Sequence, residues 1–484
     1  MSSLRSSKDL QRPLHSFEQS GLVEPEIDAV GIGRRDGHDD AVGRGRVCAK
    51  IAFRSTVGVL EMLAKIASIC DLRWEPCPRD PILRLEVTQI YILELLGANV
   101  TIKGKAYIAG IYEHPTRHAP DKSTAQLHAE VARGALADAG LTVRDVDAYF
   151  CSGDAQGALN SLVMADYLGL NKLKHFDSTD VGGSSYIAHV GHAAEAIAAG
   201  KCSVALITLA GRPRTETPPA RPVGPETAFE GALGGVAANT YAMCAMRHMY
   251  EYGTTSEQLA WVKVAASHHA QYNEHALLRK VVTVEDVINS PMVSDPLHRD
   301  DCCVVTDGGG AVIVTTPEIA KSLKRPLVRV IGHGESQKGQ NGGKDIDLTH
   351  SGAVRSGPAA FSEAGVTHQD IKYVSIYDSF TITVLMQLED LGFCKKGEGG
   401  KFVSDGNLIS GVGKLPFNTD GGGMCNNHPI NRGGITKVIE AVRQLRGEAH
   451  PKVQVANCNI ALVHGTGGSL GVRHGSATCV LERA

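Results

Sequence analysis

A glycine-rich loop near the C-terminus holds two side chains suited to chemistry, and it reads GGGMCNNHPINRGG from residue 421 to 434. Its Cys425 and His428 lie three residues apart, and a thiol beside an imidazole can act as a nucleophile with its general base. Glycine costs conformational entropy when it is ordered, so such a loop is either a flexible connector or a place where backbone approaches something closely. The spacing alone leaves open which of the two residues reacts, if either does.

Two further clusters suggest sites that their spacing does not support. The first reads SHHAQYNEH over residues 267–275, and its His268 and His269 are adjacent, whereas histidine pairs that bind metal from a helix are four residues apart. The second, DGGGA at 307–311, lacks the strand–GxGxxG–helix frame of a dinucleotide site. The sequence therefore predicts neither a metal ion nor a nicotinamide or flavin cofactor.

Composition narrows the class of protein. The chain has 484 residues, 43% of them hydrophobic and 21% charged, which indicates a globular protein of more than one domain. Its net charge of −3 argues against a nucleic-acid-binding surface. No apolar run approaches the roughly 20 residues of a membrane helix, and no secretory signal is evident. The 12 cysteines include no CxxC pair, so we expect reduced thiols in a cytoplasmic protein.

The elements that must position these residues alternate between strand and helix from about Val100 onward. Residues 124–140 have apolar side chains at helical spacing and close on Gly140, a residue type that commonly ends helices. Apolar strand-like segments precede and follow this helix. Alternation of this kind predicts an α/β fold in which helices cover a largely buried sheet.

An internal repeat is the most informative feature of this region. ALADAGLTVRDVDAYFC at 135–151 returns as AFSEAGVTHQDIKYVSI at 360–376, so that Gly140, Thr142 and Asp145 recur 225 residues later. A Gly-Gly pair also precedes a helix in each half, at 182–183 and at 433–434. Two segments repeated in the same order indicate two similar halves with a site between them.

The repeat suggests boundaries for the parts of the chain. Residues 1–98 show no regular pattern and are predicted to be a poorly structured extension. Residues 99–325 form the first half, with an inserted cap at about 212–290 that begins with a proline-rich stretch and in which residues 256–280 are expected to be helical. Residues 326–484 form the second half.

The chain from about residue 100 resembles the thiolase superfamily, and within it the sterol-carrier-protein-x or lipid-transfer thiolase-like branch. The stretches that carry the resemblance are SPMVSDPLHRDDCCVVTDGGGA, YDSFTITVLMQLEDLGFCKKGEGGKFV, NTDGGGMCNNHPINRGG and IEAVRQLRGEA. The resemblance implies a duplicated five-layer αβαβα fold with an inserted cap. It also implies a coenzyme A thioester as substrate and no further cofactor.

Members of the family use a cysteine nucleophile at the start of a buried helix. Counting back from the glycine that ends the corresponding helix places this position at Gly183, and anchoring on the glycines places it at Thr179. No cysteine lies between residues 151 and 202. Ser184 or Ser185 could act instead, but an alcohol needs an adjacent base, and the alternative is that both serines cap the helix.

The resemblance assigns the remaining site residues. His428 matches the family's GHP-type histidine, with Asn427 in place of glycine, and Tyr377 takes the place of the residue that helps to bind the thioester oxygen. His464 stands near the position of the family's second cysteine. Cys425 is expected to be a bystander. The residues expected to bind substrate are Gly183, Gly422, His464 and Gly467 in the loops, and His269 and Asn273 in the cap.

These residues predict an enzyme of acyl-coenzyme A metabolism that lacks the usual nucleophile. One reading is acyl transfer through a substitute nucleophile such as Ser184. The alternatives are retro-aldol cleavage of a β-hydroxyacyl-CoA and an acyl-CoA- or lipid-binding subunit without activity. The resemblance further implies a homodimer and a small zinc-ribbon/OB-fold partner protein.

Overall fold

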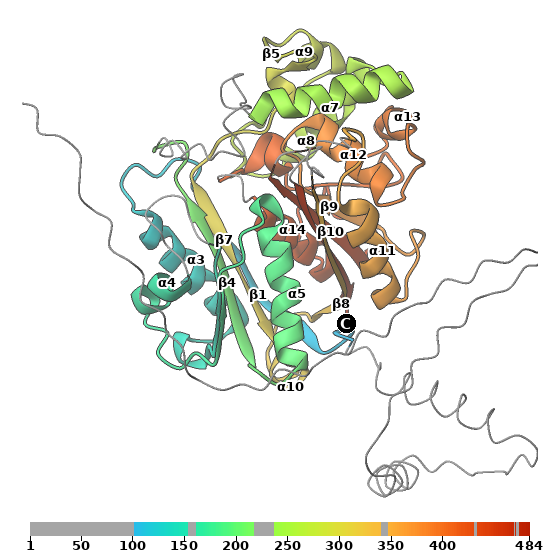
Figure 1. Cartoon of the computed structure of the whole chain (residues 1–484). Helices are drawn as coiled ribbons and strands as arrows, with labels where there is room; N and C mark the ends of the chain where they lie inside the picture. The colour runs from blue at the N-terminus through green and yellow to red at the C-terminus, as the bar shows by residue number, and fades with distance from the viewer. Residues whose placement is uncertain are drawn as a thin grey trace, which may run out of the picture. The chain divides into compact units, whose positions relative to one another are not determined.

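The computed structural model describes residues 101–152, 161–216, 237–339, 347–429, 433–468, 470 and 474–484. The extension expected at 1–98 therefore lies outside the described residues. Within the described part, strands and helices alternate along the chain (Figure 1), and the predicted α/β class is confirmed. No helix in this part is both long and apolar enough to cross a membrane.

In the described part of the chain, nine strands form one sheet in the order β3-β2-β4-β7-β1-β8-β11-β10-β9. The first half contributes β1 (Ala106–Glu113), β2 (Ala148–Phe150), β3 (His175–Asp177), β4 (Val204–Gly211) and β7 (Gly308–Thr315). The second half contributes β8 (Val328–Lys338), β9 (Tyr373–Ile376), β10 (Ile460–Gly468) and β11 (His474–Arg483). In each half the first strand pairs with the last, and the two halves join where β1 pairs antiparallel with β8.

The repeated segments have the same local structure in both halves. Helix α3 (Thr124–Ala139) ends at Gly140 with φ 71°, and α11 (Ala353–Ala364) ends at Gly365 with φ 65°. In the turn that follows each helix, the threonine hydroxyl donates to the aspartate carboxylate at 2.8 Å, from Thr142 to Asp145 and from Thr367 to Asp370. The segments that repeat at an offset of 225 residues therefore also share their local structure.

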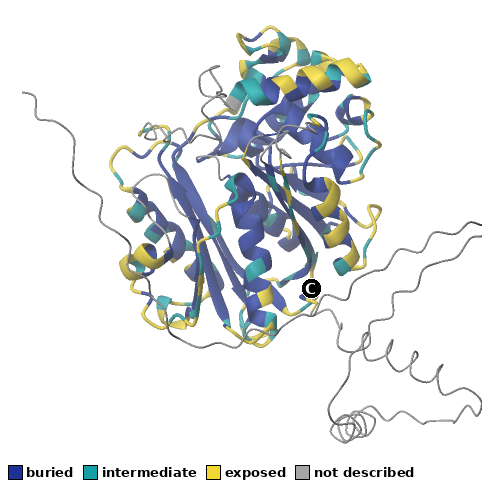
Figure 2. Ribbon diagram, in the orientation of Figure 1, coloured by how far each residue is buried: buried dark blue, intermediate teal, exposed yellow. Residues whose placement is uncertain are grey.

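Helices divide the molecule into layers. Helices α5 (Ser185–Ala198) and α14 (Gly434–Arg446) lie between the two halves of the sheet and contact strands of both. Helix α3 covers the outer face of the first half and α11 that of the second (Figure 1). The two central helices are almost entirely buried (Figure 2), so the start of α5 is enclosed by both halves.

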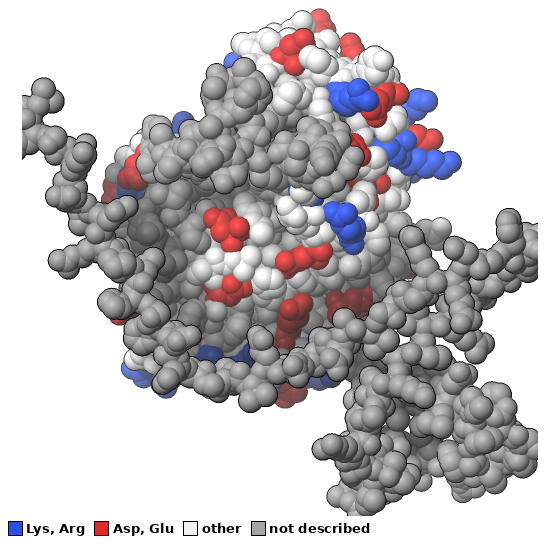
Figure 3. Space-filling model, viewed as in Figure 1, with Lys and Arg blue, Asp and Glu red and all other residues white. Residues whose placement is uncertain are grey.

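Ion pairs hold α5 against both halves. Acidic side chains gather over α5 on the face shown in Figure 3. His192 of that helix lies between two carboxylates, 2.7 Å from Asp177 on β3 and 2.8 Å from Glu335 on β8. Burial lowers the pKa of His192, but the two carboxylates outweigh it and raise that pKa to about 10. This imidazolium therefore links strands from opposite halves.

The predicted cap is mainly helical. It contains α7 (Ala237–Tyr252), α8 (Ser256–Ala270) and α9 (Val284–Ile288), followed by the hairpin β5 (Met292–Ser294) and β6 (Leu297–His298). Helix α8 contacts α12 (Thr381–Asp390), α13 (Gly399–Val403) and the glycine-rich loop. The shorter helices α4 (Ser161–Leu168) and α10 (Pro317–Ser322) complete the fold.

The cap helix that we expected over residues 256–280 ends at Ala270, and that expectation was wrong for its last ten residues. The backbone amide of Leu278 donates to the carbonyl of Cys425 at 2.9 Å, and that of Leu277 donates to Asn426 at 3.3 Å. These amides bind the glycine-rich loop, so they are not used to continue the helix.

Candidate active site

The glycine-rich loop is wrapped around a buried carboxylate. Residues Gly422–Asn426 form a single π-helical turn, and the amides of Gly423 and Met424 donate to Asp378 at 2.8 and 3.1 Å. Gly422 has φ 59°, and a Cβ at this position would lie 2.2 Å from Asp378 Oδ2. Gly422 therefore permits a close approach of the backbone to Asp378, which is one of the two roles that the glycine-rich sequence left open.

The loop places His428 against Tyr377. The Tyr377 hydroxyl lies 2.8 Å from His428 Nε2, and the exposed fractions of the two residues are only 4% and 6%. Burial lowers the pKa of His428 to about 4 and raises that of Tyr377 well above its ordinary value. At neutral pH the phenol therefore donates a hydrogen bond to a neutral imidazole. The structure therefore brings together two residues that have separate catalytic roles in the sequence-based prediction.

The Tyr377 ring also occupies the space next to Gly183. A Cβ at Gly183 would lie 2.4 Å from Cζ of Tyr377 and 2.3 Å from the carbonyl oxygen of Thr466. The alternative position, Thr179, instead donates its hydroxyl to Asp177 on β3 at 2.8 Å. Gly183 thus lies at the site, and it has no room for a cysteine side chain while Tyr377 stays in place.

Both serines that follow Gly183 use their hydroxyls to bond backbone carbonyls of the turn that precedes α5. Ser184 donates to the carbonyl of Val181, and Ser185 donates to the carbonyl of Gly182, each at 2.7 Å. Both side chains are fully buried. Ser184 stands at the N-cap of α5 but makes no side-chain capping hydrogen bond, so the capping role expected for it is not seen, and a nucleophilic role for Ser184 stays a prediction.

His464 and Gly467 lie on opposite faces of β10. His464 Nδ1 is 2.8 Å from the hydroxyl of Thr478 on β11. A Cβ at Gly467 would lie 1.8 Å from the carbonyl oxygen of Val181. Because successive side chains point to opposite faces of a strand, the structure directs His464 away from the start of α5. Gly467 permits the close contact between β10 and that helix terminus.

The cap residues predicted to bind substrate have different surroundings. His269 is buried and accepts a hydrogen bond from the Ser410 amide at 2.9 Å, and burial lowers its pKa to about 4. Asn273 lines an open pocket of about 230 Å³ and donates to the carbonyl of Asp420 at 3.0 Å. Among the described residues, no cluster of histidine, cysteine or carboxylate side chains could hold a metal ion.

Cys425 is directed into an apolar cluster with residues of α8 and α12, and its exposed fraction is 1%. Burial raises the pKa of its thiol, which disfavours the thiolate that a nucleophile needs. The structure therefore gives no support to Cys425 as a substitute nucleophile.

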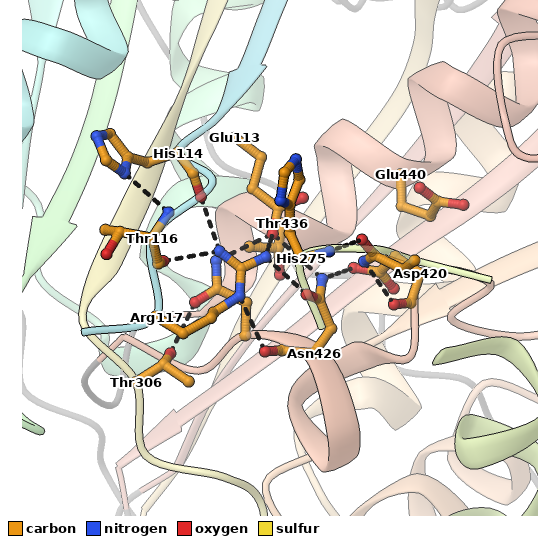
Figure 4. A network of polar contacts seen from close by, with 12 residues as sticks. Glu113, His114, Thr116, Arg117, His275, Thr306, Asp420, Asn426, Thr436 and Glu440 are labelled. Atoms are coloured by element: carbon orange, nitrogen blue, oxygen red, sulfur yellow. Dashed lines mark hydrogen bonds and ion pairs between the residues drawn. The ribbon is translucent and has the colours of Figure 1, made fainter. Parts of the chain in front are cut away.

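A charged network that sequence reasoning missed fixes the loop beside His428 (Figure 4). Arg117 donates to the side chain of Asn426 at 2.7 Å and to Glu113 at 2.8 Å, and Asn427 donates to Glu113 at 3.0 Å. Burial would raise the pKa of Glu113, but Arg117 and Arg443 outweigh it and lower it to about 2. Asn427, which replaces the family's glycine, is thus one of the anchors of the loop.

A second missed feature is the ion pair between Asp378 and Lys437 of α14, whose ammonium lies 2.7 Å from Asp378 Oδ1. Both side chains are buried. A lysine on the predicted buried helix of the second half was the only signal in the sequence for this pair, because Asp378 is distant from it along the chain.

Comparisons with known proteins identify relatives of this chain. A family model described as "Thiolase C-terminal domain-like" matches residues 334–483. An acetyl-CoA acetyltransferase of Methanothermobacter thermautotrophicus is 34% identical over 367 residues, which make up 72% of this chain and 93% of the relative. A 17-hydroxy-3-oxo-4-pregnene-20-carboxyl-CoA lyase of Mycobacterium tuberculosis is 34% identical over 365 residues, with 72% and 92% covered.

A solved structure described as "Ltp2-ChsH2(DUF35) aldolase" has the same fold, with a TM-score of 0.71 and 32% identity. The match covers 79% of this chain and 99% of that chain. The similar proteins therefore include one named as a transferase and others named as a lyase and an aldolase.

Proposed function

The chain belongs to the thiolase superfamily, and we propose that it cleaves a carbon–carbon bond of a β-hydroxyacyl-coenzyme A thioester without a covalent acyl-enzyme. One observation carries this proposal. The Tyr377 ring fills the space next to Gly183, where the family's nucleophile is expected, and its hydroxyl lies 2.8 Å from His428. The names of the lyase and aldolase relatives support the same reaction class.

The Tyr377–His428 pair can relay a proton. The β-hydroxyl of the substrate gives its proton to the Tyr377 oxygen while the phenol proton passes to His428 Nε2, which is neutral at physiological pH. The resulting alkoxide becomes a carbonyl as the bond between the α- and β-carbons breaks. The electron pair of that bond forms the enolate of the shorter thioester. Return of the proton to the α-carbon releases an acyl-CoA and a ketone or aldehyde.

Acyl transfer is the second candidate, and the name of the acetyltransferase relative favours it. That reaction by a covalent route would need Ser184, Ser185 or Cys425 to accept the acyl group. The two hydroxyls are bonded to backbone carbonyls, and burial raises the pKa of the Cys425 thiol. The third candidate, an acyl-CoA-binding subunit without activity, predicts binding without turnover.

We also propose a homodimer and a partner protein. Strand β3 is an edge strand of the sheet, and its Phe176 is 60% exposed, as is much of Leu162 on the neighbouring helix α4. An exposed apolar edge of this kind supports pairing with a second copy. The two-component description of the similar aldolase supports a partner for this chain, which we expect to be a zinc-ribbon/OB-fold protein. A cytoplasmic location remains a prediction.

The reaction is tested by incubating the protein, with and without a candidate partner, with short-chain and steroid β-hydroxyacyl-CoA thioesters. Mass spectrometry should detect a ketone or aldehyde and a shortened acyl-CoA. Tyr377→Phe and His428→Gln should each lower kcat by about 100-fold or more, because proton transfer is lost. Tyr149→Phe is the matched control, since Tyr149 is also buried and its hydroxyl bonds to Thr208 at 2.7 Å, away from the loop.

Three results would reject parts of this assignment. A covalent acyl adduct on Ser184, Ser185 or Cys425 would establish the acyl-transfer route. Full activity of Tyr377→Phe would remove Tyr377 from the mechanism. Binding of acyl-CoA with no turnover of any thioester tested would favour the binding subunit.

A further inference from the structure

The segment that returns from the cap to β7 lies against both members of the proposed proton relay. The first two amides of residues 303–306 donate to the carbonyls of Ser379 and Gly423, each at 2.9 Å. Ser379 lies two residues beyond Tyr377, and Gly423 belongs to the glycine-rich loop that carries His428. This short segment therefore connects the two parts of the chain whose side chains form the relay.

Thr306, at the end of this segment, binds the loop through its hydroxyl. That hydroxyl accepts the backbone N–H of His428 at 2.9 Å and donates to Asn427 Oδ1 at 2.7 Å. Thr306 and Asn427 are both buried. A threonine hydroxyl has one proton and two lone pairs. Because the His428 amide can only donate, the hydroxyl proton is directed to Asn427, and both bonds form at once.

Asn427 is held in the one orientation that suits this arrangement. Its Nδ2 donates to Glu113 at 3.0 Å, and an ionised carboxylate can only accept, so the amide oxygen is left to accept the Thr306 proton. Arg117 in turn donates to Glu113 at 2.8 Å, and Figure 4 includes Thr306 in the same network. A continuous series of hydrogen bonds thus runs from the end of β1 to the backbone of His428.

We propose that Thr306 is a positioning residue of the active site, whose hydroxyl fixes the backbone of His428 so that the imidazole faces the phenol of Tyr377. In this position the imidazole Nε2 lies 2.8 Å from the Tyr377 hydroxyl. This inference rests on the proposed function for its kinetic consequence only. Its structural content, the hydrogen bond between phenol and imidazole, can be measured without turnover.

Loss of the Thr306 hydroxyl should move the imidazole. Valine has nearly the shape of threonine, so Thr306→Val keeps the side-chain volume but offers no acceptor to the buried N–H of His428. A buried donor without a partner is costly, and the backbone at His428 should shift until that N–H reaches another acceptor or a water molecule. A misplacement of about 1 Å at a catalytic group can cost about 100-fold in rate.

The test compares Thr306→Val with Thr306→Ser, which retains the hydroxyl. In Thr306→Val, kcat for β-hydroxyacyl-CoA cleavage should fall by about 10-fold or more, while KM changes by less than about twofold. Thr306→Ser should stay within about threefold of the wild-type kcat, because both hydrogen bonds can still form. A Thr306→Ser protein as slow as Thr306→Val would show that the hydroxyl is not what positions His428.

Thr208→Val is the matched control. Thr208 on β4 is also fully buried, and its hydroxyl lies 2.9 Å from His128 Nδ1 and 2.7 Å from the Tyr149 hydroxyl. Its loss should lower the urea midpoint about as much as Thr306→Val does but leave kcat within about twofold of wild type. A comparable fall of kcat in both variants would mean that the rate follows stability, and the inference would fail.

Nitrogen-15 NMR of histidine-labelled protein follows the hydrogen bond itself. The Tyr377→Phe variant gives the His428 Nε2 signal of an imidazole that has lost the phenol. In Thr306→Val the signal should move from the wild-type position toward this reference, and in Thr306→Ser it should stay at the wild-type position. A folded Thr306→Val protein with the wild-type signal would overturn the inference.

A second variant keeps the inference testable if Thr306→Val does not fold. Asn427→Ala removes the acceptor of the Thr306 proton, and it should displace the His428 Nε2 signal in the same direction. An undisplaced signal in that variant would count against the inference. Absence of turnover in the wild type would instead overturn the proposed reaction and leave the NMR test standing.

Discussion

Replacing Gly183 by alanine should damage the site although it adds only one methyl group. The new Cβ would lie 2.3 Å from the Thr466 carbonyl oxygen and 2.4 and 2.6 Å from two atoms of the Tyr377 ring. The ring would have to retreat by about 1 Å to reach ordinary van der Waals contact at 3.4 Å. The carbonyl belongs to β10, where Thr466 is paired with Ser476 of β11, so it has little freedom to move.

The structure indicates how much stability and how much catalytic rate Gly183→Ala should lose. Overpacking of a close-packed core costs about 1–3 kcal/mol, and the contact with a fixed backbone atom places Gly183→Ala at the upper end of that range. A displacement of about 1 Å at a catalytic group can cost about 100-fold in rate. We therefore expect the free energy of unfolding to fall by about 3 kcal/mol and kcat for β-hydroxyacyl-CoA cleavage to fall by about 100-fold.

Urea unfolding and steady-state kinetics measure the two effects. Gly339→Ala is the control, because Gly339 is exposed and a Cβ there would meet its nearest atom only at 3.6 Å, so its effect should stay within about 0.5 kcal/mol. Truncation of Tyr377 to alanine relieves two of the three clashes. The double variant Gly183→Ala/Tyr377→Ala should then be more stable than the sum of the single effects predicts. A Gly183→Ala protein with wild-type stability and rate would refute the placement of Tyr377 over Gly183.

Three further predictions concern the surrounding residues. Ser184→Ala should cost about 1 kcal/mol, because one buried hydrogen bond to Val181 is lost, while kcat stays within about twofold; loss of all activity would identify a nucleophile instead. Burial lowers the pKa of several histidines to about 4 or 3, below the value near 6.5 in the unfolded chain, so the unfolded chain binds more protons in acid. The free energy of unfolding should therefore fall by a few kcal/mol per pH unit between about pH 6 and 4.5, and the urea midpoint should fall with it. These residues are His189, His269, His428, His464 and His474. The pH dependence of the His192 contribution has the opposite sign, since the pKa of His192 is raised to about 10. Its contribution to the free energy of unfolding is complete below about pH 6.5 and is lost as the pH rises through about 10. His192→Gln should therefore lower the free energy of unfolding by on the order of 2 kcal/mol at pH 7 and flatten the alkaline decline of wild-type stability.

Local pattern was sufficient to predict most of the fold. The helix that ends at Gly140 and the repeated turn at Thr142 and Asp145 depend on contacts within a few residues, and such contacts are encoded by neighbouring side chains. The predicted extent of the cap helix was wrong because the end of that helix depends on long-range contacts. Residues 271–280 continue the helical composition, but their backbone amides bind the loop at Cys425, which is nearly 150 residues away.

The site residues also divide into those that a local motif identifies and those that depend on long-range contacts. His428 and Tyr377 were found because each lies in a short motif, and their hydrogen bond spans 51 residues. Asp378 and Lys437 carry no motif, and their relation depends on α14 packing beside the loop. The Glu113 network is harder still, because its partners Asn426, Asn427 and Arg443 lie more than 300 residues further on. Interactions between buried charges of this kind can be identified only once the folded structure shows which residues lie together.

The side chain that fills the space beside Gly183 determines which chemistry the fold can perform. At the start of a buried helix, aligned peptide dipoles favour negative charge, and a cysteine there would become a thiolate able to attack a thioester. In this chain the same space holds a phenol whose pKa is raised well above its ordinary value, so it does not act as a nucleophile. The electrostatic advantage of the helix terminus is then available to a charge that develops on the substrate. The enolate of the proposed retro-aldol reaction is such a charge, and the phenol that takes the β-hydroxyl proton can pass its own proton to the neutral imidazole of His428, 2.8 Å away. In the reaction that we propose, the glycine at position 183 leaves room for the Tyr377 ring, and the phenol transfers a proton where a cysteine would have formed a covalent intermediate.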